Sequence, residues 1–313
     1  MPTAGNRAPT NSLIEMAAAA YRGRFAPTPS GPLHFGSLLA ALASWLDARA
    51  VNGEWLLRIE DVDTPRCPPG TSTTILKQLE AFGLSWDDEV RYQHQHNADY
   101  QAALDQLIAT GVAYPCNCSR KQWQQWGKYP GWCRHKTTPP PGEHAWRLRT
   151  DAPCQPAQVS WHDRRLGHEQ WCPETLGDVI IKRRDNLWAY QLAVVVDDAS
   201  QGITDIVRGS DLLDNTPWQL LLQQNLGYST PRYLHVPLAR LPNGQKLSKQ
   251  NKAPALPTQT IGIRTMLINA LKALGQSPHA ELLDVATDDI LQWAVQHWAP
   301  SELPGQDIQP SQH

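Results

Sequence analysis

From residue 21 onward, short apolar runs of strand length alternate with longer helical patterns, and this alternation restricts the fold more than any other feature. Residues 22–26 and 54–59 have the length and composition of strands, while residues 37–50 and the stretch around 75–79 have helical periodicity. Strands that alternate with helices of this length indicate βαβ units around a parallel sheet. Such sheets bind ligands at the carboxyl ends of their strands, where the loop of residues 24–37 lies.

The alternation is interrupted once. Residues 112–178 are rich in Cys, Trp, Pro and Gln, contain the sequence PPPG at 139–142 and show no long apolar periodicity, so we predict an inserted subdomain. Apolar patterns predict a helix at residues 98–110, strands at 178–181, 192–196 and 233–236, and helices at 218–225, 262–275 and 287–298.

These patterns divide the chain into six regions. They are a flexible leader (1–20), the first half of an α/β core (21–111), the insert (112–178), the second half of the core (179–256), a C-terminal helical region (257–304) and a polar, disordered tail (305–313). Met16 is an alternative start. The run Met16–Ala20 is too short for a signal sequence or a membrane span, so we expect a cytoplasmic protein.

The overall charge does not indicate a nonspecific nucleic-acid binder, because 28 Lys and Arg face 30 Asp and Glu for a net charge of -2. RNA would have to bind through a local basic patch. The candidates are Arg120 and Lys121 with Lys128, Arg147 with Arg149, and the run Lys182, Arg183 and Arg184, although such charges are also usual on a solvated surface.

Two loops have the composition of a nucleotide site. In RFAPTPSGPLHFGS, residues 24–37, a Ser-Gly turn opens a helix, which points free backbone N–H groups and the positive end of the helix dipole at a ligand. An ordinary strand-to-helix loop is also rich in Pro and Gly, so this composition alone does not identify a nucleotide site. The later loop QKLSKQ, residues 245–250, carries two lysines suited to neutralising a triphosphate during phosphoryl or nucleotidyl transfer.

Together these loops resemble the paired motifs of class I aminoacyl-tRNA synthetases, LHFGS at residues 33–37 and KLSKQ at 246–250. The sequences RFAPTPSG, RIEDVDTPR, AVVVDD and ITDIVRG resemble the glutamyl branch of that class, and the likeness extends over about residues 23–257. The resemblance implies an α/β, Rossmann-type catalytic core with an inserted zinc-containing subdomain and a short helical C-terminal region.

The sequence departs from full-length glutamyl-tRNA synthetases after the second loop. Only 64 residues follow Lys249 (313 − 249), too few for the large helical anticodon-binding domains of those enzymes. We therefore expect a member of the short branch that attaches glutamate to the queuosine base at the wobble position of tRNA(Asp). HFGS, KLSKQN and APALP, the last at residues 253–257, resemble that branch in particular.

The expected enzyme is a monomeric ligase that forms glutamyl-adenylate from L-glutamate and ATP with Mg²⁺. It then transfers the glutamyl group to queuosine-containing tRNA(Asp). One alternative is a minimal glutamyl-tRNA synthetase that charges the tRNA 3′ end. Another is a non-catalytic tRNA-binding module, against which the intact loop motifs argue.

The resemblance also assigns individual residues. It implies that His34 and Lys249 are catalytic. It places ATP against His34, Gly36, Ser37, Lys246, Ser248 and Lys249, and glutamate against Arg24, Ala26, Thr28, Glu60, Tyr190 and Arg208. The chemistry suits a dicarboxylate with an ammonium group, because Arg binds carboxylates through paired hydrogen bonds and a buried carboxylate can hold the ammonium. By composition alone, Arg24, Glu60 and Arg208 would be surface charges and Tyr190 a core tyrosine.

Three of the six cysteines, Cys116, Cys118 and Cys133, lie within one short segment of the predicted insert. Clustered thiols in a small loop-rich subdomain suggest one structural Zn²⁺, which prefers four tetrahedral N or S ligands and contributes to folding. The fourth ligand is Tyr129 by the family resemblance, while His135 is the chemically commoner choice. Three ordinary buried thiols or a redox pair are the alternatives.

Overall fold

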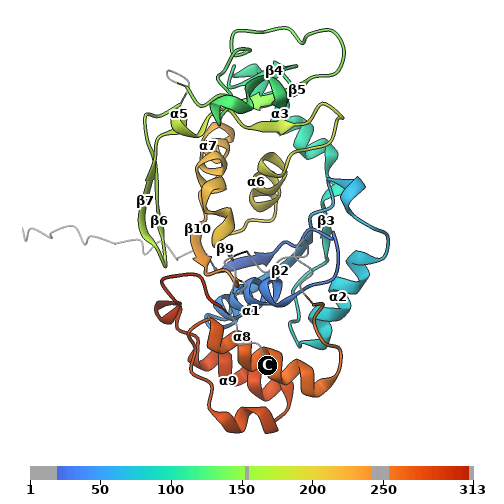
Figure 1. The fold of residues 1–313 in the computed structure, drawn as a ribbon, viewed down its shortest axis with the longest axis vertical. Helices are drawn as coiled ribbons and strands as arrows, with labels where there is room; N and C mark the ends of the chain where they lie inside the picture. The colour runs from blue at the N-terminus through green and yellow to red at the C-terminus, as the bar shows by residue number, and fades with distance from the viewer. Residues whose placement is uncertain (1–19, 152–154, 241–244, 246–253, 310–313) are drawn as a thin grey trace, which may run out of the picture.

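The computed structural model describes residues 20–151, 155–240, 245 and 254–309 (Figure 1). Its strands are β1 (Arg22–Phe25), β2 (Glu54–Ile59), β3 (Arg91–Tyr92), β4 (Ala113–Cys116), β5 (Ala145–Leu148), β6 (Val159–Asp163), β7 (Gly167–Trp171), β8 (Ile180–Lys182), β9 (Asp205–Gly209) and β10 (Arg232–Val236). Its helices are α1 (Phe35–Arg49), α2 (Thr71–Ala81), α3 (Asn97–Ala109), α4 (Arg120–Trp123), α5 (Pro173–Leu176), α6 (Tyr190–Ser200), α7 (Thr216–Leu226), α8 (Thr260–Ala273) and α9 (Thr287–His297). Within these ranges, no helix has the length and hydrophobicity needed to cross a membrane.

The centre of the molecule is a parallel sheet, as the alternation of strands and helices predicts. β1 pairs with β2 and β2 with β3, while β9 pairs with β10, all in parallel. β9 lies beside β1, where the Thr204 backbone N–H donates to the Arg22 carbonyl. These five strands therefore follow the order β3-β2-β1-β9-β10, and the expected α/β class is confirmed.

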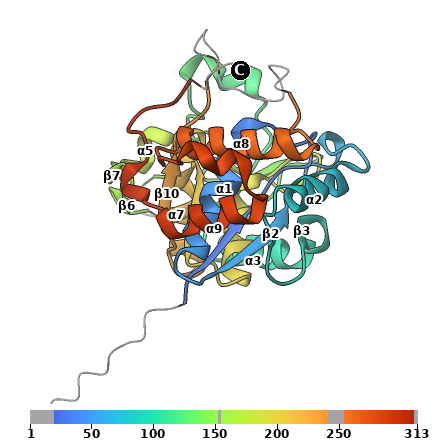
Figure 2. The same ribbon diagram turned by 90° about the horizontal axis from the view of Figure 1, so that it is seen from below.

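Helices cover both faces of this sheet. α1, α8 and α9 share one hydrophobic cluster on the first face, and α3, α6 and α7 share another on the second (Figures 1 and 2). Ten of the 15 residues of α1 are buried, because α8 and α9 cover the side that faces away from the sheet. Burying a Leu or Trp side chain contributes on the order of 2 kcal/mol, so this packing fixes the position of α1 and its N-terminus.

The strand predicted at residues 192–196 is wrong, because these residues belong to helix α6. The run Leu192–Val196 is 0–4% exposed and packs on α3, α7 and β8. A helix that is buried on all sides shows no polar face, so its apolar β-branched run has the same appearance in sequence as a buried strand.

Pairing in the predicted insert crosses its expected boundary. β8, expected to rejoin the main sheet, instead forms an antiparallel sheet with β5, which pairs with β4. β6 lies inside residues 112–178 and yet pairs in parallel with β10 of the core. The division of the chain at residue 178 stays a prediction. Two strands of the predicted insert pair with strands beyond its boundary, β5 with β8 and β6 with β10.

The predicted disordered tail is wrong over residues 305–309. Ile308 forms a parallel bridge with Ala239, with backbone hydrogen bonds to Leu238 and Arg240. The Asp307 carboxylate accepts hydrogen bonds from the Leu238 backbone N–H at 2.9 Å and from Arg240 Nε at 2.7 Å. The composition of the tail did not indicate this docking, because the docking depends on Leu238 and Arg240, which lie almost 70 residues earlier in the chain. Residues 310–313, like leader residues 1–19, lie outside the described ranges.

Candidate active site

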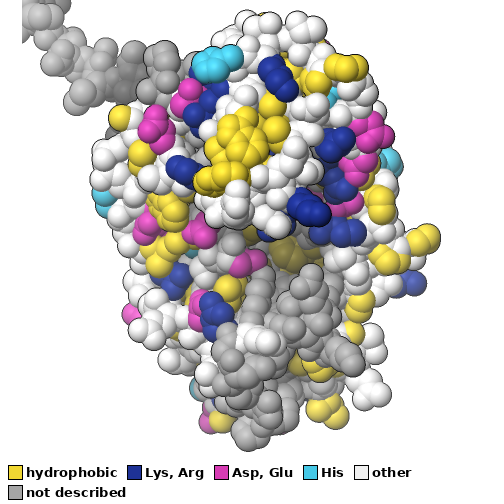
Figure 3. Space-filling view, turned by 45° about the horizontal axis from the view of Figure 1, so that its top comes forward, with side chains coloured by type: hydrophobic (Ala, Val, Ile, Leu, Met, Phe, Trp, Pro, Cys, Tyr) yellow, Lys and Arg dark blue, Asp and Glu magenta, His cyan; other side chains and the backbone are white. Residues whose placement is uncertain are grey.

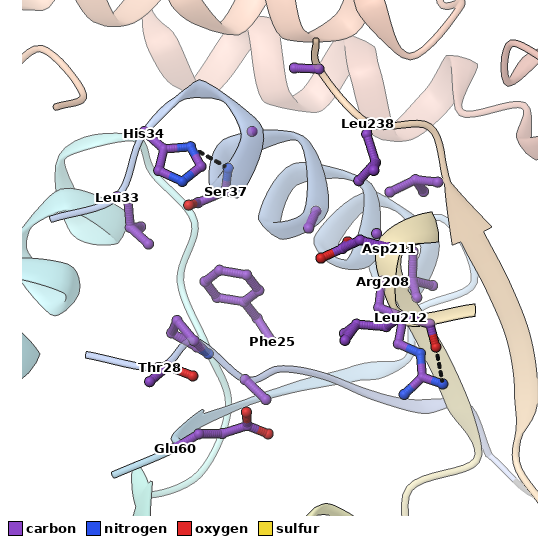
Figure 4. A pocket seen from close by; sticks show the side chains of 18 of the residues that line it. Phe25, Thr28, Leu33, His34, Ser37, Glu60, Arg208, Asp211, Leu212 and Leu238 are labelled. Atoms are coloured by element: carbon purple, nitrogen blue, oxygen red, sulfur yellow. Dashed lines mark hydrogen bonds between the residues drawn. The ribbon is translucent and has the colours of Figure 1, made fainter. Parts of the chain in front are cut away.

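A cavity of about 270 Å³ opens at the carboxyl ends of β1, β2, β9 and β10. It lies where crossovers leave the sheet in opposite directions, the usual ligand position in such folds. Nine of the site residues expected from the sequence line it: Arg24, Ala26, Thr28, His34, Gly36, Ser37, Glu60, Tyr190 and Arg208. Figure 4 shows His34, Thr28, Glu60 and Arg208 around the cavity, with Phe25 between them.

His34 forms the N-cap of α1 at one end of the cavity. Its Nδ1 accepts a hydrogen bond from the Ser37 backbone N–H at 3.3 Å (Figure 4). The preceding residue, Leu33, donates its backbone N–H to Gln78 Oε1 of α2 at 2.7 Å. The start of α1 is thereby held from both sides, and its positive dipole end lies at the cavity wall formed by Gly36 and Ser37.

Lys246, Ser248 and Lys249 lie outside the described residues, whereas residues on either side of their loop are described. On the N-terminal side, Leu238 and Ala239 line the cavity. On the C-terminal side, Ala255 forms a bridge with His34, and the Leu256 N–H donates to the Leu33 carbonyl at 2.9 Å. One flank of the loop therefore lines the cavity, and the other lies beside the N-terminus of α1.

Arg24 and Glu60 come from β1 and the end of β2. Arg24 donates through Nε to Asp198 Oδ1 at 3.1 Å and through Nη2 to Asp198 Oδ2 at 3.5 Å. Burial raises the pKa of Glu60 to about 7, although the nearby Arg58 and Arg24 oppose this shift. The pair thus offers one cavity-lining guanidinium to a carboxylate and one carboxylate, ionised above neutral pH, to a cation.

Arg208, at the end of β9, is already engaged by protein groups. Its guanidinium donates to His235 Nε2 at 3.1 Å, Gln219 Oε1 at 2.7 Å, Thr216 Oγ1 at 2.8 Å, the Leu212 carbonyl at 3.4 Å and the Tyr190 hydroxyl at 3.5 Å. The bonds to Leu212 and Tyr190 are the longest. A carboxylate that binds Arg208 must displace one of these two.

Two buried groups support Arg208 from behind. His235 Nδ1 lies 2.6 Å from Asp163 Oδ2, and both side chains are fully buried. Burial lowers the pKa of His235, which keeps the ring neutral. Since Nε2 accepts from Arg208, Nδ1 carries the proton and donates it to Asp163. This chain fixes the Arg208 side chain without adding a second positive charge.

Tyr190, at the start of α6, completes the wall between Arg208 and Glu60. Burial raises the pKa of its hydroxyl, so the group stays neutral and can donate a hydrogen bond. Ala26 and Thr28 follow β1, with Thr28 exposed at the mouth of the cavity. These three side chains supply shape and neutral polar contacts between the charged groups.

The sequence did not reveal the groups that hold this site in place. Asp198 accepts from Arg24 and from Arg58 Nη2 at 2.6 Å, while Asp197 accepts from Arg91, Gln93 and Tyr100. Burial alone would raise the pKa of Asp198, but the two arginines hold it below its usual range. The sequence signal for these groups was the pair Asp197 and Asp198, directly after the apolar run at residues 192–196. Acids in a buried segment need cationic partners, so this pair indicated buried arginines.

A second cluster lies apart from the cavity. The sulfur atoms of Cys116, Cys118 and Cys133 all lie within 4.8 Å of one another, at the end of β4 and after α4. The Tyr129 hydroxyl lies 3.4 Å from Cys116 Sγ and 3.5 Å from Cys118 Sγ, and it accepts the Cys133 backbone N–H at 3.1 Å. Three sulfur atoms and one phenol oxygen therefore lie close together, a donor set that fits a metal ion of tetrahedral preference.

Comparisons with known proteins place the chain among tRNA synthetases. Residues 20–294 match the family described as tRNA synthetases class I (E and Q), catalytic domain. A glutamyl-Q tRNA(Asp) synthetase of Ectopseudomonas mendocina (strain ymp) is 50% identical over 289 residues, covering 91% of this chain and 95% of the relative. Another, from Thiobacillus denitrificans, is 52% identical over 294 residues, covering 91% and 96%.

A solved structure of a glutamate-tRNA synthetase from Elizabethkingia anophelis has the same fold. The TM-score is 0.78 at 23% identity, and the match covers 93% of this chain and 68% of that one. The two proteins therefore share a fold although only 23% of the aligned residues are identical.

Proposed function

Because the chain belongs to the class I (E and Q) tRNA synthetase family, we propose that it activates glutamate with ATP and transfers the glutamyl group to tRNA. The acceptor we propose is the queuosine base at the wobble position of tRNA(Asp), after the glutamyl-Q tRNA(Asp) synthetases that it resembles at 50–52% identity. The observation that carries the proposal is the cavity, which brings Arg24, Glu60 and His34 together at the β1–β9 edge.

In the first step, a glutamate α-carboxylate oxygen attacks the ATP α-phosphorus and pyrophosphate leaves. Arg24 binds a substrate carboxylate, and ionised Glu60 holds the ammonium group. The N-terminus of α1, His34 and Lys249 stabilise the charge that develops on the phosphates. Mg²⁺ bound with ATP would supply further charge neutralisation.

In the second step, a hydroxyl of the queuosine cyclopentene ring attacks the glutamyl carbonyl carbon. The bond to AMP breaks, AMP leaves as the anion, and the hydroxyl proton passes to solvent or to the phosphate. No covalent enzyme intermediate is needed, so the site requires positioning groups rather than a nucleophile. We propose that the enzyme acts as a cytoplasmic monomer.

The cysteine cluster is proposed to hold one structural Zn²⁺ through Cys116, Cys118, Cys133 and Tyr129. Tyr129 is favoured over His135 as the fourth ligand because its hydroxyl lies among the sulfur atoms, while the His135 side chain is exposed. Such an ion would connect β4 to the loop after α4, a region with little hydrophobic core of its own.

The test of the activation step is amino-acid-dependent exchange of labelled pyrophosphate into ATP, run with and without tRNA(Asp). We expect exchange with glutamate and none above background with aspartate or glutamine, after the glutamyl-Q tRNA(Asp) synthetases that the chain resembles. Exchange with glutamine but not glutamate would contradict the substrate assignment.

Glutamate binding is expected to weaken as the pH falls below 7. The Glu60 pKa of about 7 means that the carboxylate is ionised above this pH and protonated below it, and only the ionised form attracts the substrate ammonium. Between pH 8 and pH 6, the KM for glutamate should rise about tenfold. We expect Glu60→Gln to raise this KM at every pH and to flatten its pH dependence.

The matched control for this experiment is Glu54→Gln, at the exposed, opposite end of the same strand. It should leave the pH profile unchanged. A Glu60→Gln enzyme that keeps the wild-type pH profile would show that another group holds the ammonium.

Asp307→Ala is expected to lower kcat/KM for ATP about fivefold. The substitution removes the bonds that hold Leu238 and Arg240, the described residues directly before the lysine-containing loop. The Arg240–Asp307 pair is partly exposed, so its net contribution is about 1 kcal/mol. Steady-state kinetics with varied ATP would measure the effect, with Glu302→Ala on the exposed surface nearby as control. Unchanged ATP kinetics would mean that the docked tail does not position the loop.

A further inference from the structure

Two tryptophans are exposed beside the cysteine cluster. Trp126 and Trp132 have 51% and 49% of their surface open to solvent, and their rings meet edge to face with centroids 5.1 Å apart. Large aromatic side chains are usually buried, and a pair of them in contact on a surface is typical of a binding site.

The chain segment that carries this pair is basic. Residues 106–142 contain no Asp or Glu but include Arg120, Lys121, Lys128, Arg134 and Lys136, in a chain whose net charge is -2. Arg134 is paired with Asp178, whereas the other four side chains are exposed. Figure 3 shows hydrophobic side chains bordered by Lys and Arg on this end of the molecule, which is the upper end in Figure 1.

The tryptophan pair has a rigid support. The Trp132 ring lies 6.1 Å from that of buried Tyr129, and Tyr129 in turn lies 6.0 Å from Trp123. The Arg147 guanidinium covers the Tyr129 ring at 3.9 Å. Because Tyr129 is fixed among the three cysteines, the platform above it is ordered before any partner binds, which reduces the entropy cost of binding.

We propose that Trp126 and Trp132 form a stacking platform for an unpaired base of the tRNA, with Arg120, Lys121, Lys128 and Lys136 contacting its phosphates. Exposed aromatic faces within a chain segment that carries cations and no acids match single-stranded nucleic acid, whose bases stack and whose backbone is anionic. A protein partner would be expected to cover a larger apolar area. The inference rests on the proposed function and adds the surface that holds the RNA.

The test is tRNA binding by full-length variants, measured by filter retention at several salt concentrations. We expect Trp126→Ala to raise the Kd for tRNA(Asp) about tenfold and Trp126→Phe to restore it to within about twofold, because an aromatic face is what the base requires. Lys128→Ala should instead lower the slope of log Kd against log salt by about 0.7–0.9, whereas Trp126→Ala should leave the slope unchanged.

Two further measurements keep the outcomes separate. Glutamate-dependent pyrophosphate exchange and the Tm should stay at wild-type values in Trp126→Ala, since the pair lies outside the cavity. Val51→Ala, which alters another exposed hydrophobic side chain, is the control. Wild-type Kd in Trp126→Ala, with exchange intact, would overturn this inference alone. Ultracentrifugation would show whether the wild-type protein self-associates. Self-association that Trp126→Ala abolishes, with tRNA binding unchanged, would assign the surface to a second copy of the chain. A wild-type protein that binds no tRNA would overturn the proposed function as well.

Discussion

Lys249→Ala is expected to lower glutamate-dependent pyrophosphate exchange about 100-fold to 1,000-fold. The flanks of its loop, Leu238–Ala239 and Ala255–Leu256, lie at the cavity and beside His34, so the loop begins and ends at the predicted phosphate position. Removing one pre-organised charge from a developing transition state costs about 3–4 kcal/mol. Exchange rates at saturating glutamate and ATP would measure the loss.

The matched control is Lys272→Ala, an exposed lysine on α8. We expect this variant to keep full activity, and both variants to keep the wild-type Tm. Exchange within a factor of two of wild type in a folded Lys249→Ala enzyme would remove Lys249 from the catalytic assignment. The N-terminus of α1 and His34 would then have to stabilise the phosphates without it.

The second large effect is expected for Cys116→Ser. The bound zinc should fall from one ion per chain to below about 0.1, because a structural site loses most of its affinity with one thiolate. The Tm should fall by about 10 °C, because β4 and the loop after α4 would lose the metal ion proposed to connect them. Metal analysis of the purified protein and thermal unfolding would measure both.

Substitutions of Tyr129 and His135 distinguish the two candidates for the fourth zinc ligand. Tyr129→Phe is expected to lower zinc content, whereas His135→Ala should not, since only the tyrosine hydroxyl lies among the sulfur atoms. Cys172→Ser, outside the cluster, is the control for loss of a thiol elsewhere. Full zinc occupancy in Cys116→Ser, or none in the wild-type protein, would contradict the proposed metal site.

Local patterns were sufficient to predict the parts of the fold with short-range causes. The alternation around β1, α1 and β2 predicted the parallel sheet, and the Ser-Gly turn before His34 predicted a helix N-terminus at the ligand edge. The family resemblance added Glu60, Tyr190 and Arg208, which nothing in their own surroundings distinguishes. All three line the same cavity as His34.

The rest depends on contacts between distant residues. Helix α6 was mistaken for a strand because burial on every side removes the polar face that marks a helix. The relay from Asp163 through His235 to Arg208 joins β6, β10 and β9, and no spacing within one segment reveals it. Docking of Asp307 on Arg240 is likewise a property of the folded chain rather than of tail composition.

The most direct test of the proposed function is transfer of labelled glutamate, with ATP and Mg²⁺, to three purified acceptors. They are tRNA(Asp) with queuosine, tRNA(Asp) without it, and tRNA(Glu). We predict label on queuosine-containing tRNA(Asp) alone, bound so that removal of the tRNA 3′ end does not release it. Label on tRNA(Glu) at its 3′ end, with none on queuosine, would contradict the proposed acceptor and identify a minimal glutamyl-tRNA synthetase.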